Sequence, residues 1–235
     1  MSNTLKKKSK IYTYDLGVGI KAKNFSKKKP VKYVYNFESP DKVNSDNGKK
    51  KYKKLSYNLG DEATVIHIPS YVKDPDALMT ELLEEIPWQF YEYENPEGKK
   101  GLYPRLMHVL HYDRKSDEKL IHKLPELDKI KKRVEKLTSR KFKYAVLNHY
   151  RDGNDHIGYH EDKEVGNDQL VVSVTVGATR RFVLKHKFRQ EIRHVFMLAH
   201  GDVLILNYGA IKGSYKHSVP KMANVGPRIN ITFRE

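Results

Sequence analysis

The sequence NHYRDGNDHIGYHED, residues 148–162, decides how the rest of this chain is interpreted. The apolar run before it, residues 142–147, predicts a strand that delivers a polar loop to one place. His160 and Asp162 stand two residues apart, so on an extended backbone both side chains leave the same face. An imidazole beside a carboxylate supplies two of the three ligands of a 2-His-1-carboxylate metal site. Such a pair also arises by chance in a chain with 11 histidines, so it needs support from elsewhere.

Two later segments give that support. His217, in the sequence YKHSVP (residues 215–220), is the candidate for the third ligand, although taken alone it is more often a polar loop histidine. The final segment, residues 228–234, alternates polar and apolar residues like a half-buried strand. Its polar face carries two arginines, and guanidinium groups bind carboxylates in a bidentate manner. The segment therefore predicts a site for a dicarboxylate.

Together these motifs resemble the AlkB family of 2-oxoglutarate/Fe(II)-dependent nucleic-acid dealkylases, over about residues 64–235. In chain order the matching motifs are NxY (148–150), DG (152–153), DxIGxHxD (155–162), SVTxGA (173–178), HS (217–218) and RxNxTxR (228–234). Several independent motifs in the same order make the resemblance specific. The long form DGxDxIG looks most like the branch of AlkB homologues 2 and 3, which repair DNA and in part RNA.

The resemblance implies a role for each residue of the site. His160, Asp162 and His217 would bind Fe(II) and leave coordination positions for 2-oxoglutarate and O2. The residues implied to bind the cosubstrate are Arg228 and Tyr150 at its distal carboxylate, Arg234 and Asn148 near its metal-side carboxylate, and Asn230 from the same motif. Because six residues of straight strand span about 20 Å, both arginines must lean inward or the strand must bend.

The implied reaction is oxidative dealkylation of bases of the 1-methyladenine and 3-methylcytosine type in DNA, and in RNA as a further substrate. It releases formaldehyde, succinate and CO2. A base in a duplex must be flipped out, or already single-stranded, to reach the metal. Three residues are candidates for substrate binding. They are Glu164, facing the cationic base or simply on the surface; Tyr112, stacking on the flipped base or half-buried in the fold; and Arg105, filling the gap or contacting a phosphate.

The fold class expected is mainly β with flanking helices (α+β), a double-stranded β-helix or jelly roll. Strands are expected at residues 63–68, 88–94, 105–110, 142–147, 170–176, 181–187, 192–198, 202–207 and 228–233. Helices are expected at residues 74–86 and 125–137, where proline stands in the first turn. By the resemblance, residues 88–112 form an N-terminal nucleotide-recognition lid, and the jelly-roll core covers about residues 142–235.

The net charge of +16 lies mostly at the N-terminus. Residues 1–54 hold 16 lysines against 4 acidic residues (16 − 4 = +12), and the remainder holds 29 Lys+Arg against 25 Asp+Glu (29 − 25 = +4). We expect residues 1–60 to form a lysine-rich, largely disordered arm and residues 61–235 to form the dioxygenase domain, although residues 31–37 alternate like a strand. The arm either binds polyanions such as nucleic-acid phosphates, serves as a nuclear address, or only keeps the protein in solution.

Composition narrows the class of protein. The chain has no apolar run long enough to span a bilayer, and its lysine-rich N-terminus lacks an apolar signal-peptide core. We therefore expect a soluble monomer with no membrane partner, nuclear in a eukaryote and otherwise cytoplasmic. The absence of cysteine excludes disulfides and zinc–thiolate sites.

Three other functions stay open at this point. The first is an RNA demethylase acting on single strands, since residues 96–101, at the tip of the expected lid, lack the apolar side chains of a duplex-opening wedge. The second is a non-catalytic nucleic-acid-binding protein, against which the complete ligand set argues. The third is a protein hydroxylase on the same scaffold, which the basic arm disfavours.

Overall fold

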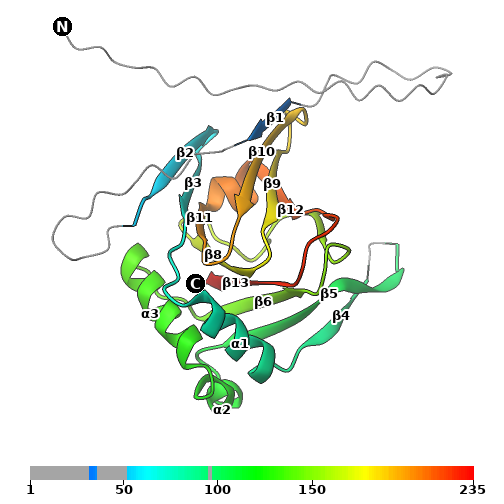
Figure 1. Ribbon diagram of the computed structural model, residues 1–235. Coiled ribbons are helices and arrows are strands. Elements are labelled where there is room, and N and C mark those ends of the chain that lie inside the picture. The colour runs from blue at the N-terminus through cyan, green and yellow to red at the C-terminus, as the bar shows by residue number, and fades with distance from the viewer. Residues whose placement is uncertain (1–31, 36–51, 95–96) are drawn as a thin grey trace, which may run out of the picture.

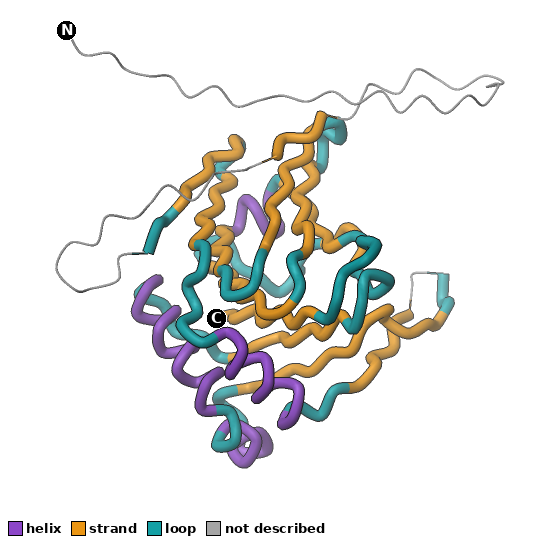
Figure 2. The backbone as a smooth tube through the Cα atoms, viewed as in Figure 1, coloured by secondary structure: helices purple, strands orange, loops and turns teal. Residues whose placement is uncertain are grey.

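Two β-sheets with mainly antiparallel strands pack against each other (Figure 1), and strands are the commonest element along the chain (Figure 2). The computed structural model describes residues 32–35, 52–94 and 97–235. Within these residues the larger sheet has eight strands in the spatial order β2 (Leu55–Gly60), β3 (Ala63–Ile68), β11 (Val203–Asn207), β8 (Leu170–Gly177), β13 (Arg228–Arg234), β6 (Tyr144–Tyr150), β5 (Lys100–His111) and β4 (Gln89–Glu94). The smaller sheet has five, in the order β1 (Lys32–Tyr35), β10 (Ile192–Leu198), β9 (Arg180–His186), β12 (Tyr215–Val219) and β7 (Ile157–His160). The one parallel pair among them joins β1 to β10.

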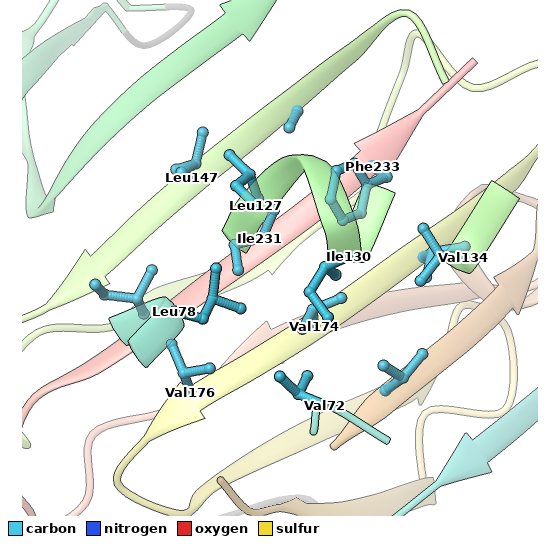
Figure 3. Packing of buried hydrophobic residues seen from close by; sticks show 14 of the residues in the cluster. Val72, Leu78, Leu127, Ile130, Val134, Leu147, Val174, Val176, Ile231 and Phe233 are labelled. Atoms are coloured by element: carbon cyan, nitrogen blue, oxygen red, sulfur yellow. The ribbon is translucent and has the colours of Figure 1, made fainter. Parts of the chain in front are cut away.

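Helices α1 (Pro75–Glu85) and α3 (Pro125–Thr138) lie on one face of the larger sheet (Figure 1). A core of buried apolar side chains fills the space between these helices and the larger sheet (Figure 3). Its members include Leu78 from α1, Leu127, Ile130 and Val134 from α3, Val174 and Val176 from β8, and Ile231 and Phe233 from β13. A second core, which includes Val65, Leu184, Phe196, Leu204 and Tyr215, packs between the two sheets. The larger sheet is thus covered on both faces, one by helices and one by the smaller sheet.

Local sequence signals set the ends of both long helices. The Asp74 side chain accepts a hydrogen bond from Ala77 N at 3.0 Å and caps α1, and Pro75 occupies its first turn. The N-terminus of α3 has no cap of its own. The Glu81 carboxylate of α1 takes that place, accepting hydrogen bonds from Glu126 N at 2.7 Å and Leu127 N at 2.9 Å. The two helices are therefore joined by a capping interaction as well as by their apolar faces.

Three further helical segments are short. A 3-10 helix (Lys115–Asp117) and α2 (Glu118–Ile121) connect β5 to α3, and a π-helix (Gly209–Gly213) lies directly before β12. Among the described residues, no helix combines the length and apolar character needed to cross a membrane.

The fold class predicted from the sequence is confirmed, and several elements have the predicted bounds. Strands β3 and β10 match their predictions residue for residue, and α1 and α3 match theirs within one or two residues at each end. The strand predicted at residues 142–147 is present as β6, but its bounds were wrong, because β6 begins at Tyr144 and continues through Tyr150. Its pairing with β13 extends from Tyr144 to Tyr150, so Asn148 and Tyr150 lie on a strand and not in a loop.

Two expectations about burial and boundaries were also wrong. All seven residues of β13 are buried, whereas the alternating pattern predicted a half-buried strand. The folded part begins before residue 61, because β2 pairs with β3 and the Tyr52 ring packs 4.7 Å from the Tyr71 ring. The expected strand within residues 31–37 is present as β1. Most of the lysine-rich arm, residues 1–31 and 36–51, lies outside the described residues, as do residues 95–96 of the hairpin tip.

Candidate metal centre and cosubstrate site

The three predicted metal ligands converge on one point between β7 and β12. His160 is the last residue of β7, Asp162 follows it by two residues, and His217 is the central residue of β12. The pairing of the two strands places His217 directly opposite His160. Nε2 of each histidine lies 3.6 Å from Asp162 Oδ1, and one ligand atom from each of the three residues lies within 4.8 Å of the others. This spacing suits a single metal ion.

Both imidazoles are held in the form that binds a metal. Burial lowers the pKa of His217 to about 3, aided by the neighbouring His160, and burial also lowers the pKa of His160. Each ring is therefore neutral at physiological pH. His160 Nδ1 lies 2.9 Å from the Gly158 carbonyl oxygen, which can only accept, so Nδ1 carries the proton and Nε2 keeps its lone pair. That lone pair faces Asp162.

A cation holds the carboxylate ligand from its other side. Asp162 is 5% exposed, and its Oδ2 lies 2.9 Å from Arg234 Nη2. Arg234 also forms an ion pair with Glu164. Asp162 Oδ1 thus faces the histidines while Oδ2 is neutralised. Two neutral nitrogens and one carboxylate oxygen are the donor set of the 2-His-1-carboxylate Fe(II) site, so these residues fit that metal.

Arg228 is a buried cation with few partners inside the chain. It is 1% exposed, and burial lowers its pKa to about 10. Its Nη2 donates to Thr175 Oγ1 at 2.9 Å, and its guanidinium lies 5.2 Å from the centre of the Tyr150 ring. Nε and Nη1 are buried, and neither has a hydrogen-bond partner in the part of the chain that the structure describes. Buried donors without partners are costly, and a carboxylate would satisfy both, so the site fits one end of a dicarboxylate.

The remaining residues predicted to bind the cosubstrate lie on the same sheet. Asn148 and Asn230 face each other across β6 and β13. Asn148 Oδ1 accepts from Arg105 Nε at 2.6 Å, while Asn230 Nδ2 donates to Ser173 Oγ at 2.7 Å and to the Val174 carbonyl at 3.0 Å. Both asparagines have other lone pairs and protons left for a ligand.

A cavity of about 810 Å³ joins the metal ligands to these residues. Its wall includes His160, Asp162, His217, Asn148, Tyr150 and Arg234. Arg228 is not among the wall residues. Its guanidinium contacts the ring of Tyr150, which is a wall residue. A straight strand separates the two arginines by more than the length of the cosubstrate. Arg234 lies directly beside the metal ligand Asp162, whereas Arg228 is at the far end of the strand.

Comparison with known proteins identifies the family of the chain. The family profile described as "2OG-Fe(II) oxygenase superfamily" matches residues 64–234. The chain belongs to the 2OG-Fe(II) oxygenase superfamily. Members of this superfamily use Fe(II), 2-oxoglutarate and O2, in agreement with the His160–Asp162–His217 triad.

Within the superfamily, this oxygenase is similar to members of the AlkB family. It is 37% identical to "DNA oxidative demethylase ALKBH2" of Bos taurus over 123 residues, which are 48% of this chain and 44% of that protein. It is 31% identical to "Alpha-ketoglutarate-dependent dioxygenase alkB homolog 3" of Mus musculus over 186 residues, 71% of this chain and 64% of that protein. "Uncharacterized protein R406" of Acanthamoeba polyphaga mimivirus is 34% identical over 114 residues, 47% of this chain and 59% of that protein. The matches thus span about half of these relatives.

A solved structure shares the fold of this oxygenase. OsALKBH1 superimposes with a TM-score of 0.50 and 16% sequence identity, over 73% of this chain and 97% of that chain. At this identity the likeness concerns the fold alone.

The three residues predicted to bind substrate in this oxygenase differ in their placement. Glu164 lines the cavity, with its side chain 49% exposed. Arg105 also lines the cavity, but it is only 3% exposed and bonded to Asn148, so it reaches neither a phosphate outside nor a gap in a duplex. Tyr112 was placed wrongly. It packs against the helix-side core beneath the Lys131 ammonium, and it does not line the cavity.

Two cations that hold the loops of this oxygenase were missed by reasoning from the sequence. Arg180, which is fully buried, donates to the carbonyls of Asp152, Asp155 and Pro220 at 3.0, 2.8 and 2.8 Å, and so ties the loop before β7 to the end of β12. Lys212 of the π-helix donates to the carbonyls of Lys163 and Val165 at 2.6 and 2.9 Å. These carbonyls flank Glu164. Neither cation belongs to one of the sequence motifs quoted above.

Proposed function

We propose that this oxygenase removes alkyl groups from nitrogen atoms of bases in nucleic acid by oxidation. The substrates proposed are bases of the 1-methyladenine and 3-methylcytosine type, in DNA first and in RNA as the alternative. The names of its relatives support this class, since one is a DNA oxidative demethylase and another an alpha-ketoglutarate-dependent dioxygenase.

The observation that carries the proposal is the set of residues that line the cavity. A complete 2-His-1-carboxylate triad lies in the wall of a space of about 810 Å³. Cavities of about 300–1,000 Å³ hold ligands of drug size, which suits a cosubstrate together with one base. The β4–β5 hairpin forms part of the wall through Tyr93 and Leu102, which are 39% and 56% exposed. These side chains are available to contact a nucleotide at the mouth.

The residues of this chain would bind and orient the reactants. When bound, Fe(II) and 2-oxoglutarate supply with O2 the oxidation of an alkyl C–H bond, and the products are succinate, CO2 and formaldehyde. Arg228 would hold the distal carboxylate of 2-oxoglutarate through its two free donors, assisted by Thr175. Arg234 keeps Asp162 in position. Apolar residues in the cavity wall, among them Phe182 and Ile211, would limit the entry of water.

Glu164 supplies the recognition of a cationic base. Bases methylated at these positions carry a positive charge, and a carboxylate within a few ångströms of a cation stabilises it. Glu164 lies in the cavity wall two residues after Asp162, and Lys212 holds the carbonyls on either side of it. The base would reach this carboxylate only when flipped out of a duplex or when its strand is single.

The test is turnover on defined oligonucleotides. The full chain is incubated with Fe(II), 2-oxoglutarate and matched single-stranded and double-stranded DNA or RNA carrying one 1-methyladenine or 3-methylcytosine. Formaldehyde and succinate are measured together, with Asp162→Ala as the control that removes one metal ligand. We expect formaldehyde and succinate in equal amounts from at least one methylated strand, and neither product from the control.

The outcomes separate the alternatives. Neither product from any substrate would overturn the enzyme proposal and favour a non-catalytic binding protein. Succinate without formaldehyde would mean that the cosubstrate site works and that the substrate class is wrong. Turnover of RNA alone would replace the DNA proposal by the RNA demethylase.

We propose in addition that the lysine-rich arm holds the protein on nucleic-acid phosphates. Residues 1–31 carry 9 lysines and 1 aspartate, a net charge of +8. Deleting them leaves β1 and all later residues in place. Since single-stranded binding weakens with salt in proportion to the phosphates neutralised, the deletion should flatten the dependence of log K on log[salt]. An unchanged slope would make the arm a bystander.

A further inference from the structure

The outer face of the smaller sheet carries a cluster of cations around one exposed tyrosine. Neighbouring residues on a strand point to opposite faces, and His160 and His217 point inward to the metal centre. Tyr159 and Lys216, their chain neighbours, therefore point outward. Tyr159 is 42% exposed, and the Lys216 side chain is 46% exposed. Together with Lys185 of β9 and Arg193 of β10, they form what we call the outer basic face.

Strand pairing brings the cations of this face into one row. Lys185 pairs with Arg193 on one side and with Lys216 on the other, so the three stand side by side across β10, β9 and β12. Two of them lie against the tyrosine. Lys185 Nζ is 5.4 Å from the centre of the Tyr159 ring, and Arg193 Cζ is 5.8 Å from it. These contacts fix the orientation of an aromatic ring on the surface.

The row has an excess of positive charge. Burial and the like charges of Arg193 and Lys216 lower the pKa of Lys185. Within the described part of the chain, neither Lys185 nor Arg193 has a carboxylate at ion-pair distance. Lys216 does have an ion-pair partner, Glu161 at 3.6 Å, but Glu161 also pairs with Lys187 at 2.7 Å. A polyanion placed on the row would relieve this repulsion.

We propose that the outer basic face binds the single strand on one side of the target base, with Tyr159 stacking on an unpaired base and Lys185, Arg193 and Lys216 contacting phosphates. The inference rests on the proposed function and names the path of its substrate. It goes beyond the lid and the arm, because the face lies on the other sheet from the β4–β5 hairpin and consists of described residues.

The position of Tyr159 connects the face to the metal centre. It directly precedes the ligand His160 and also belongs to the wall of the cavity. Because Tyr159 belongs both to the cavity wall and to the outer basic face, a strand whose target base enters the cavity can place the adjacent nucleotide at this residue. Surfaces that bind single strands combine aromatic platforms with cations along the backbone, and both are present here. A base stacked inside a duplex has both faces covered by its neighbours, which favours a single strand over a duplex.

The test measures binding of an unmodified single-stranded 12-mer by fluorescence anisotropy, with the full chain and at several salt concentrations. Tyr159→Leu should raise Kd about tenfold, and Tyr159→Phe should keep nearly the wild-type Kd, since the ring is retained. The double variant Lys185→Ala/Arg193→Ala should lower the slope of log K against log[salt] by about 1.4, because two phosphates are no longer neutralised. Its turnover should fall more on a methylated 12-mer than on a methylated trimer.

The matched control removes two exposed cations on the helix side, Lys119→Ala/Lys136→Ala. It should leave Kd and the salt slope unchanged. The proposal is overturned if the control and the Lys185/Arg193 variant lose affinity equally, or if Tyr159→Leu binds like the wild type. It is also overturned if the Tyr159→Leu substitution weakens binding of a duplex of the same length as much as binding of the single strand. These binding results do not depend on turnover, so a protein without demethylase activity would refute the proposed function and leave this inference standing.

Discussion

Replacing Arg228 by methionine tests whether the buried guanidinium is there for the cosubstrate. Arg228 donates a hydrogen bond to Thr175, and two more of its donors are buried without a partner among the described residues. Breaking a buried ion pair usually destabilises a protein by about 3–5 kcal/mol. Here no carboxylate contacts the cation among the described residues, so the loss of one hydrogen bond and one ring contact is offset by removing two unsatisfied donors, each worth about 1–3 kcal/mol. We expect Arg228→Met to change the stability of the cosubstrate-free protein by less than about 1 kcal/mol.

The effect on cosubstrate binding is expected to be much larger. Two charge-assisted hydrogen bonds to a carboxylate contribute about 3–6 kcal/mol, so their loss raises Kd at least a hundredfold. At a 2-oxoglutarate concentration of about 100 times the wild-type Kd, binding stabilises the wild type by about 2.7 kcal/mol. For a domain of this size that corresponds to about 5–10 °C in Tm. The variant, with Kd at or above the same concentration, should gain about 0.4 kcal/mol or less, which is about 1–2 °C.

The assay is thermal unfolding with Mn(II) in place of Fe(II), which prevents turnover, with and without 2-oxoglutarate. Arg114→Met, in the exposed turn after β5, is the matched control and should keep the full shift. Two results would refute the reasoning. A full 2-oxoglutarate shift in Arg228→Met would mean that the carboxylate binds elsewhere. A loss of more than about 3 kcal/mol without the cosubstrate would mean that Arg228 serves the fold itself.

Three other polar groups lead to predictions of their own. Tyr112→Phe removes a buried hydroxyl that has no hydrogen-bond partner among the described residues, so the free energy of unfolding in urea should rise by about 1 kcal/mol and turnover should be unchanged; a fall in stability would mean that the hydroxyl does have a partner. Lys212→Met releases the two carbonyls beside Glu164, and we expect Kd for Mn(II) to rise about tenfold or more, as for other residues that position metal ligands, with Lys212→Arg restoring part of the affinity. Burial lowers the pKa of His194 to about 4, below its unfolded value of about 6.5, so stability should be lost as pH falls through 6.5, by about 2 kcal/mol between pH 7.5 and 5. His194→Gln should remove that part of the pH dependence. An equal loss of stability between pH 7.5 and 5 in the wild type and the variant would show that His194 is not its cause.

The parts of the fold that could be predicted from the sequence are those encoded by neighbouring residues. Asp74 and Pro75 start α1 through contacts within one turn, and the alternation in residues 63–68 marks β3 without reference to a partner. The strand β12 has no such signal. Its sequence, YKHSV, is mixed in character, and it becomes a strand because β9 pairs along one edge and β7 along the other. Long-range pairing of this kind is invisible to a local pattern.

The candidate site follows the same division. The metal ligands could be predicted from a motif. The substrate residues could be predicted only once it was known which face of its strand each side chain points to. On β5, the residues Arg105, Met107 and Val109 line the cavity, while Leu110 is in the helix-side core. The same alternation, continued past the end of the strand, puts Tyr112 beside Leu110. The facing of Tyr112 was thus available in the sequence once one residue of the strand had been assigned to a face.

The burial of β13 explains why the cosubstrate side can keep unsatisfied cations at all. Its odd residues Ile229 and Ile231 are fully buried against the helices, while Arg228 and Arg234 occupy the opposite face. The apolar face anchors the strand by hydrophobic contacts that do not depend on the cavity. The polar face is therefore held in place even though Arg228 Nε and Nη1 and Arg234 Nε have no hydrogen-bond partners within the described ranges. If this is correct, disrupting the apolar face should loosen the cosubstrate site before any cavity residue is changed. Ile231→Ala would cost about 2–5 kcal/mol of stability and should weaken 2-oxoglutarate binding, whereas Ile66→Ala in β3, at a partly buried position packed against the same core, should cost stability without changing Kd.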